Sequence, residues 1–307
     1  MNDFCSAALA MFPGIDGKIT RQQIISVMRE HDMKWPNFER SSRGIYEFPM
    51  VINTESDSDI EARIADTFES LESLVESVAS NNVNSLVVAG APGLGKSYTV
   101  NKVLHSVNGG SEYNYTFHRG YIRATHLYRL LWENRFKGQV IVLDDTDAIF
   151  FDDTALNILK AALELKPSRR IGWGSEKILI DEDGEEIPRY FDYDGSIIFL
   201  TNLPFREMIS SNSKNAPHLS ALESRSLVLD LKIKTKKEYL IKMKQTINSG
   251  MLDDKLTKNE QKEVMGFLEE NIDKFSDFSL RMVEKISAIF LSNPNNWQKL
   301  CKAVCFK

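Results

Sequence analysis

Short apolar runs alternate with amphipathic stretches through the middle of the chain. The runs, each typical of a buried strand, are Ser85–Ala89, Tyr113–His118, Val140–Leu143, Ser196–Leu200 and Leu227–Leu231. Between them, apolar residues recur at helical spacing in Lys96–Ser106, Thr125–Arg135, Thr154–Leu165 and Leu219–Glu223. Strands separated by helices predict an α/β fold with a parallel five-stranded sheet and helices on both of its faces.

The segments on either side of this core have different patterns. Before it, Ile60–Ala79 has the period of an amphipathic helix, Thr20–Met33 that of a helix capped by Thr20, and residues 54–59 are predicted to be a linker or a helix start. After Lys232 the pattern is helical only, with helices predicted at Lys236–Asn248, Asn259–Asn271, Ser279–Ser292 and Asn295–Val304. We therefore expect a small α/β or winged-helix-like N-terminal module (1–55), an α/β domain (56–232) and a C-terminal helical lid (233–307).

Composition narrows the class of protein. Of 307 residues, 42% are hydrophobic and 26% are charged, which excludes a wholly disordered chain. No apolar run is long enough to span a bilayer, and no basic segment precedes the apolar stretch Ala7–Phe12, so neither a membrane partner nor a secretory signal is expected. Three cysteines without metal-ligand spacing favour a reducing, cytoplasmic setting. The net charge of −5 argues against a general DNA-coating protein.

The strongest motif follows the first strand of the core. Gly90-Ala91-Pro92-Gly93-Leu94-Gly95-Lys96-Ser97 matches GxxxxGKS and opens a helix. Glycines let such a loop turn so tightly that its backbone N–H groups converge on phosphate oxygens at the positive end of the helix. Lys96 would place its charge on the β- and γ-phosphates, and Ser97 would offer its hydroxyl to Mg²⁺. The sequence predicts a nucleoside-triphosphate site that includes these residues and Tyr98.

Two acids follow the third strand. Asp144 and Asp145 stand at the carboxyl end of that strand, where the ligands of open α/β sheets bind. Asp144 would hold the metal, directly or through water, and Asp145 would polarise the attacking water. An acidic loop after a buried strand is the alternative. Asp147, Asp152 and Asp153 are predicted to be solvated loop residues or helix caps.

The order of these parts resembles the AAA+ ATPases, the ring-forming P-loop family, from about residue 60 to residue 292. Thr201-Asn202, after the fourth strand, resembles sensor 1, whose amide helps orient the attacking water. The resemblance places ATP and Mg²⁺ at the site as cofactors. A polar turn after a strand is the alternative interpretation of Asn202.

Two arginines complete the resemblance. Arg225, in Ala221–Ser226 before the last strand, resembles the arginine finger that reaches the γ-phosphate of a neighbouring subunit. Arg281, in Phe278–Arg281 at a helix start, resembles sensor 2, which contacts the phosphates of its own subunit. Surface arginines are the alternative in both places. A finger acting between subunits implies a homo-oligomer, expected as a hexameric ring.

One residue departs from the family pattern. AAA+ proteins usually have glutamate after the metal-binding aspartate, and this chain has Asp145, which is one methylene shorter. A general base needs hydrogen-bond reach to the water, so this difference favours slow hydrolysis or a switch-like use of ATP. The compact chain with a short N-terminal module also resembles phage-encoded members of the family.

Several segments bear on what such a ring would act on. Residues 169–193 predict a β-hairpin with its turn at Asp183-Gly184, which resembles the pre-sensor hairpin of an AAA+ branch that includes helicases and unfoldases. A surface hairpin without a substrate role is the alternative. The lysines from residue 232 to residue 244 form a basic run, which is also typical of a solvated helix face. The N-terminal module is interpreted first as a partner-docking module, and a winged-helix-like reader and simple packing are the alternatives.

The loop after the second strand is the other candidate for substrate contact. Tyr121 and Ile122 would grip a peptide, or Arg119 and Arg123 would meet phosphates. An ordinary loop with a buried tyrosine is equally in keeping with the pattern. We expect an ATPase that remodels a protein or a protein–DNA complex; the alternatives are a non-processive ATP-dependent docking switch and a DNA motor or helicase loader. Whether nucleic acid binds stays open.

Overall fold

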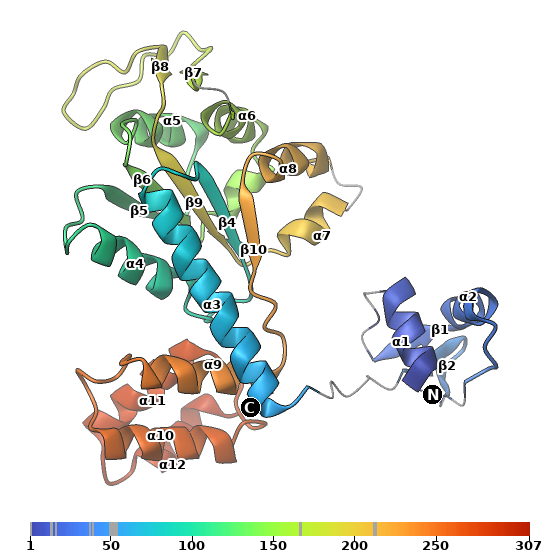
Figure 1. Cartoon of the computed structure of the whole chain (residues 1–307). Helices are drawn as coiled ribbons and strands as arrows, with labels where there is room; N and C mark the ends of the chain where they lie inside the picture. The colour runs from blue at the N-terminus through green and yellow to red at the C-terminus, as the bar shows by residue number, and fades with distance from the viewer. Residues whose placement is uncertain are drawn as a thin grey trace. The chain divides into compact units, whose positions relative to one another are not determined.

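The computed structural model describes residues 2–12, 15, 17–36, 38, 40–48, 55–165, 168–210 and 214–307. The chain divides into two compact units, Met1–Asp59 and Ile60–Lys307 (Figure 1). Thr54, where the predicted linker starts, lies outside the described residues. Helix α3 (Asp57–Ala79) begins within the rest of that segment.

The N-terminal unit is a small α/β fold. Its elements are α1 (Asn2–Met11), β1 (Lys18–Thr20), α2 (Arg21–His31), β2 (Arg40–Ser42) and β3 (Ile45–Glu47), and its strands form an antiparallel sheet in the order β1-β3-β2. Thr20 caps α2 as predicted: its hydroxyl accepts a hydrogen bond from the Gln23 N–H, and the Gln23 side chain accepts one from the Thr20 N–H. Phe4, Ile24 and Phe48 are buried in the core of this unit.

A five-stranded sheet forms the centre of the second unit. Its order is β10 (Leu227–Asp230), β4 (Ser85–Ala89), β9 (Ser196–Thr201), β6 (Val140–Asp144) and β5 (Tyr115–Arg119), and every neighbouring pair is parallel. β4, β6 and β9 are buried along their whole length, as is typical of the central strands of a parallel sheet. The predicted fold class, an α/β fold with a parallel five-stranded sheet and helices on both faces, is confirmed.

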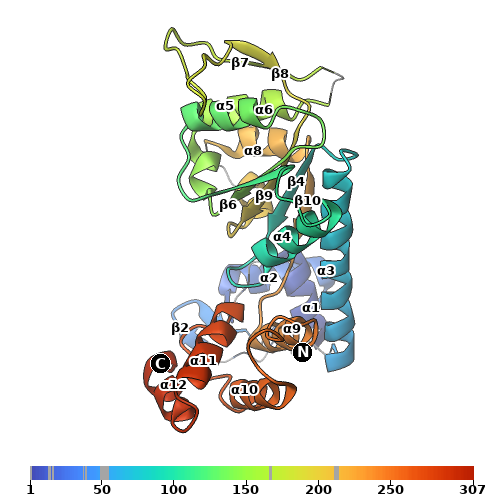
Figure 2. The same cartoon turned by 90° about the vertical axis from the view of Figure 1, so that its left-hand side faces the viewer.

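Helices cover both faces of the sheet. Leu86 and Val88 of β4 face α3 and α4 (Lys96–Val107), whereas Val87 and Ala89 face α5 (Ala124–Glu133), α6 (Asp153–Ala162) and α8 (Ala216–Glu223) (Figure 2). This alternation follows the period of two along a strand. Two short helices of the second unit were not predicted: η1 (Asp147–Phe151), a 3₁₀-helix, and α7 (Phe205–Ser210). Each is five or six residues long, too short for a recognisable apolar period. Helix α1 of the N-terminal unit was not predicted either.

The predicted hairpin is also present. β7 (Arg170–Gly172) pairs with β8 (Tyr190–Asp192) in antiparallel fashion, and an isolated bridge joins Ile180 to Glu186 nearer the turn. Figure 1 shows the hairpin beyond α5 and α6, at the end of the unit away from the C-terminal helices.

Four helices make up the C-terminal part: α9 (Lys236–Asn248), α10 (Lys258–Glu270), α11 (Leu280–Ser292) and α12 (Trp297–Cys305). They enclose a hydrophobic core of their own, which includes Val264, Phe275 and Trp297. Cys301 and Cys305 are buried free thiols in this core. Among the described residues, none of the helices combines the length and the apolar character needed to cross a bilayer.

Lys242 corrects the interpretation of the basic run as a solvated helix face. Only 8% of this residue is exposed, and its ammonium group lies 3.1 Å from the centroid of the Phe68 ring of α3. Burial lowers the pKa of Lys242 to about 8, against a smaller opposing effect of the Glu72 carboxylate. The apolar face of α9 therefore includes a lysine whose charged form is disfavoured in the fold.

We expect Lys242→Met to stabilise the protein at neutral pH. Below pH 8 Lys242 is protonated in the folded chain and places a buried charge there. Between pH 8 and about pH 10 this lysine is protonated more in the unfolded chain than in the folded chain, so the free energy of unfolding of the parent rises with pH over that range. Methionine should raise the free energy of unfolding by about 1–3 kcal/mol near pH 7 and flatten that rise. Urea unfolding near pH 7 and near pH 9.5 measures both effects.

Lys244→Met is the matched control, because Lys244 is exposed and pairs with Glu269 at 2.9 Å. A surface ion pair of this kind contributes at most about 1 kcal/mol. Lower stability of Lys242→Met than of the parent at pH 7 would contradict the prediction.

Candidate nucleotide-binding site

The P-loop turns from β4 into α4. Gly95 is the N-cap of α4 with a φ of 88°, and none of the described side chains caps the helix. The first N–H groups of this 12-residue helix are therefore available to a ligand at its positive end. Gly93 has a φ of 72°, and a Cβ there would lie 2.4 Å from the Cβ of Ser279, so both backbone conformation and packing require glycine.

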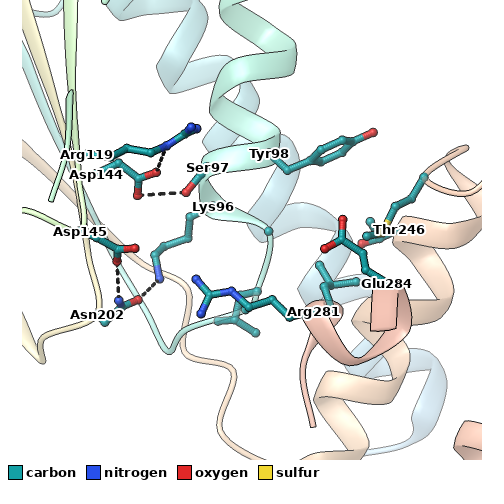
Figure 3. A pocket seen from close by; sticks show the side chains of 15 residues that line it. Lys96, Ser97, Tyr98, Arg119, Asp144, Asp145, Asn202, Thr246, Arg281 and Glu284 are labelled. Carbon is teal, nitrogen blue, oxygen red and sulfur yellow. Dashed lines mark hydrogen bonds and ion pairs between the residues drawn. The ribbon is translucent and has the colours of Figure 1, made fainter. Parts of the chain in front are cut away.

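A cavity of about 520 Å³ opens beside this loop. Its volume is in the range of small-molecule sites, about 300–1,000 Å³. Three groups of residues line it: Gly93–Tyr98 of the P-loop and α4; Arg119, Asp144, Asp145 and Asn202 at strand ends; and Thr246, Met251, Leu280, Arg281 and Glu284 of the C-terminal helices (Figure 3). The sheet and the helical part therefore both contribute to one site.

Lys96 is the centre of a hydrogen-bond network. Its ammonium group donates to the carbonyl oxygens of Gly90 (2.6 Å) and Ala91 (3.0 Å) and to Oδ1 of Asn202 (2.8 Å). Burial lowers the pKa of Lys96 to about 8, although the carboxylates of Asp145 and Asp144 oppose that shift. A phosphate group here would bring the negative charge that the protonated lysine needs.

Asn202 connects Lys96 to the second acid. Its Nδ2 donates to Oδ1 of Asp145 at 2.9 Å, while its Oδ1 accepts from Lys96. The contact exists because β9 lies between β4 and β6, so the residue after β9 faces both the P-loop and the end of β6. Asp145 has a φ of 53°, a left-handed conformation that aspartate adopts more readily than most residues.

Asp144 faces the P-loop serine. The Ser97 hydroxyl donates to Oδ1 of Asp144 at 3.0 Å, and Arg119 Nε lies 3.2 Å from Oδ2. A hydroxyl and a carboxylate side by side are the oxygen ligands that Mg²⁺ takes together with substrate phosphates. Within the described ranges, no cluster of three or more His, Cys, Asp or Glu side chains is arranged to hold a metal. The residues present thus fit a magnesium ion shared with a nucleotide, held by Ser97 and Asp144.

The C-terminal helices close the site from the other side. Ser279 is the N-cap of α11, and the Leu280 N–H donates to the carbonyl of Gly93 at 2.9 Å. Figure 3 shows Arg281, in the first turn of α11, extending toward Lys96. The predicted sensor-2 arginine therefore lies in the same cavity as the P-loop.

Arg225 lies elsewhere. It precedes the amino end of β10, whereas the cavity is at the carboxyl ends of the strands. Its guanidinium donates to the Ala221 carbonyl (2.9 Å) and pairs with Glu164 (3.2 Å). Arg225 is thus not an isolated surface residue, and it takes no part in the nucleotide cavity of its own chain.

The chain is 31% identical over 248 residues to a protein of Enterobacteria phage T4, the uncharacterized 36.7 kDa protein in the nrdC-mobD intergenic region. The match covers 80% of this chain and 75% of that protein. This chain belongs to the same family as that phage protein. No known family model matches the sequence.

Three solved structures are similar to parts of the chain. NtrX from Brucella abortus in complex with ATP is 16% identical over 74% of this chain, with a TM-score of 0.40, and the match spans half of that protein's length. Drosophila ORC bound to DNA is 11% identical, and the match covers 94% of this chain and 71% of that chain with a TM-score of 0.40. C. elegans PCH-2 is 13% identical, and the match covers 82% of this chain and 68% of that chain with a TM-score of 0.30. The fold is assigned from the parallel sheet and the P-loop.

The other residues of the P-loop and the aspartates after β6 differ in how they relate to the cavity. Gly93–Tyr98 line the cavity, Gly90 and Ala91 contact Lys96 through their carbonyls, and Pro92 is exposed. Asp152 caps α6 as predicted, accepting from the Thr154 and Ala155 N–H groups. Asp147 is not merely solvated, because it accepts a 2.6 Å hydrogen bond from the Thr201 hydroxyl beside the Asn202 turn.

The loop after β5 corrects one prediction and adds a site residue. Ile122 is 3% exposed and belongs to the core, so it does not reach a substrate, whereas Tyr121 is 71% exposed. Arg119 lines the nucleotide cavity. Its role was missed because the register that places it opposite Asp144 is a property of the sheet, and the strand's sequence alone does not fix it.

Proposed function

We propose that this protein is an ATPase of the AAA+ type, which binds ATP with Mg²⁺ and hydrolyses it. The observation that carries the proposal is the chain of hydrogen bonds from Lys96 through Asn202 to Asp145. The cation that would bind the phosphates and the carboxylate that would polarise the water thus lie at opposite ends of one amide. Ser97 and Asp144, beside it, would supply the metal ligands.

The roles of the side chains follow from their chemistry. Lys96 and Arg281 would hold the phosphates as point charge and guanidinium, and the P-loop N–H groups would surround them. Asp145, with Asn202 bonded to it, would orient and polarise the attacking water. Mg²⁺, when bound, would supply charge neutralisation at the β- and γ-phosphates.

Arg225 supports the further proposal of a homo-oligomeric ring. It is remote from the cavity of its own chain, so any action on a phosphate must be on a neighbour's nucleotide. A hexameric ring that remodels a protein or a protein–DNA complex in the cytoplasm is the form of this proposal that the family resemblance favours.

The second candidate function is a slow, ATP-dependent switch that docks partners. Two contacts favour the switch: the hydrogen bond from Asn202 to Asp145 and the ion pair of Arg119 with Asp144. Such a resting arrangement must rearrange before hydrolysis, and the short Asp145 side chain limits its reach to water.

Asp145→Asn distinguishes binding from turnover. Asparagine can still accept from Asn202, so nucleotide binding should persist, while the carboxylate that polarises water is lost. We expect phosphate release from Mg·ATP to fall by at least about tenfold. A well-placed general base contributes ~10²–10⁴-fold, and the short Asp145 should contribute no more than that. Release of inorganic phosphate and binding of a fluorescent ATP analogue are measured on the same preparations.

Asp183→Asn, in the exposed turn of the hairpin, is the control and should match the parent. Unchanged turnover in Asp145→Asn would remove Asp145 from the proposed mechanism. Turnover by the parent is also measured with single-stranded DNA, duplex DNA and unfolded protein. Stimulation by one of them identifies the class of substrate, and tight ATP binding without turnover under all conditions favours the switch.

A further inference from the structure

Both oxygens of the Asp144 carboxylate are engaged. Oδ1 accepts from the Ser97 hydroxyl, the group that would share a metal with it, and Oδ2 accepts from Arg119 Nε. The carboxylate is 8% exposed and is fixed at the end of β6, whereas the Arg119 side chain is 65% exposed. Of the two partners in this ion pair, only the arginine has room to move away.

A cation on Asp144 opposes a divalent cation on the same carboxylate. The Arg119 guanidinium and a magnesium ion bound to the same carboxylate would lie close together and repel each other. The Arg119–Asp144 ion pair must therefore weaken for the metal to bind fully. Water on the arginine side lowers the cost of releasing it. Magnesium entry and the Arg119–Asp144 ion pair are therefore competing equilibria.

Arg119 is joined directly to the exposed loop that begins at Gly120. Gly120 has a φ of 90°, and its N–H donates to the Asp144 backbone carbonyl at 3.3 Å. The next residue, Tyr121, is largely exposed, and Ile122 anchors the loop in the core. A movement of the Arg119 side chain thus takes place one residue before the Gly120–Asp144 backbone hydrogen bond at which this loop begins.

We propose that Arg119 is a positioning residue of the metal site, which competes with Mg²⁺ for Asp144 and, when displaced, alters the exposed loop from Gly120 to Arg123. The inference rests on the proposed nucleotide site. According to this inference, binding of the metal at the nucleotide site changes the solvent-facing loop from Gly120 to Arg123. The loop then presents Tyr121 differently to a partner according to whether the metal is bound.

The first test is the magnesium requirement of nucleotide binding. Binding of a fluorescent ATP analogue to the full chain is titrated with Mg²⁺ in the parent and in Arg119→Gln, which removes the charge but keeps a hydrogen-bond donor. The half-saturating Mg²⁺ concentration should fall about two- to fivefold in Arg119→Gln, the worth of a partly exposed ion pair. Arg119→Lys, which keeps the charge, should stay close to the parent.

The second test follows the loop itself. Tyr121→Cys gives a unique accessible thiol, because Cys5, Cys301 and Cys305 are buried, and it can carry an environment-sensitive fluorophore. Emission should change when Mg²⁺ is added to the ATP-bound parent, and this change should be reduced in the Arg119→Gln background. Arg123→Gln is the matched control, since it removes a positive charge from the same loop away from Asp144.

The outcomes separate this inference from the proposed function. If the parent binds no nucleotide, both are overturned. If the parent binds Mg·ATP but Arg119→Gln needs as much Mg²⁺ as the parent or more, or if Arg123→Gln has the same effect, the competition at Asp144 is overturned and the nucleotide site stands. A loop signal unchanged by Arg119→Gln overturns the link to the loop.

Discussion

Lys96→Ala is expected to lose ATP binding. The ammonium group is buried beside the P-loop, where it bonds to Gly90, Ala91 and Asn202, and in the bound state it would exchange these acceptors for phosphate oxygens. Each charge-assisted hydrogen bond contributes about 1.5–3 kcal/mol. Losing contacts to two phosphates should weaken binding by roughly 10²–10⁴-fold, measurable by titration with a fluorescent ATP analogue.

The control for this substitution is Lys102→Ala, in the same helix but exposed. It should bind ATP like the parent. Thermal unfolding by circular dichroism shows whether Lys96→Ala still folds, because the alanine removes one of the cations near Asp144, Asp145 and Asp147. A folded Lys96→Ala protein that binds ATP as tightly as the parent would overturn the nucleotide site.

Local patterns were sufficient to predict most of the second unit. A strand that is apolar on both faces, such as Ser85–Ala89, is visible as a continuous run, and β4 occupies that range. The capping residue Thr20 indicated the start of α2 for the same reason, since it acts within one turn of the helix. Elements with a clear local pattern could therefore be predicted, whereas η1 and α7 are too short to show one.

The parts that were not predicted depend on how distant segments meet. The sequence shows Lys242 only as one of several lysines, and its burial against Phe68 depends on the packing of α9 on α3. In the same way, the ion pair of Arg119 with Asp144 depends on the register of β5 against β6. The contact of Gly93 with Ser279 joins residues from opposite parts of the unit.

The P-loop motif was predictable because its chemistry is concentrated in eight consecutive residues. The rest of the site is assembled from strand ends and from α11, and only the order of β9 between β4 and β6 brings Asn202 to Lys96. Its place in the chain resembled sensor 1, but the two hydrogen bonds of the Asn202 side chain could be assigned only from the structure.

Arg225 is the residue on which the oligomeric proposal depends. It is held within its own chain by Glu164 and by the Ala221 carbonyl, and its buried Nε has no hydrogen-bond partner among the residues that the structure describes. If a neighbouring subunit presents a phosphate, the guanidinium would exchange the partly exposed Glu164 for a more negative group. Arg225 would then complete a site that a single chain leaves without it.

We expect Arg225→Ala to reduce ATP turnover about a hundredfold while ATP binding remains. Arginines that act between proteins contribute ~10³–10⁵ in rate in other phosphoryl-transfer systems, and the short Asp145 argues for a smaller effect here. Specific activity of the parent should also rise with protein concentration as interfaces form. Arg206→Ala is the matched control, because Arg206 is an exposed arginine near Glu223 in the same region.

Mixing two inactive variants tests whether the active unit is an interface. A subunit with Arg225→Ala has an intact P-loop, and a subunit with Lys96→Ala has an intact arginine, so mixed assemblies contain some interfaces in which both are present. Turnover of the mixture should therefore exceed that of either variant alone. If mixing restores nothing, and if turnover per chain is independent of concentration in a monodisperse monomer, Arg225 does not act between subunits. Its pairing with Glu164 would then be structural, and the single-chain switch would be the better account of the ATP site.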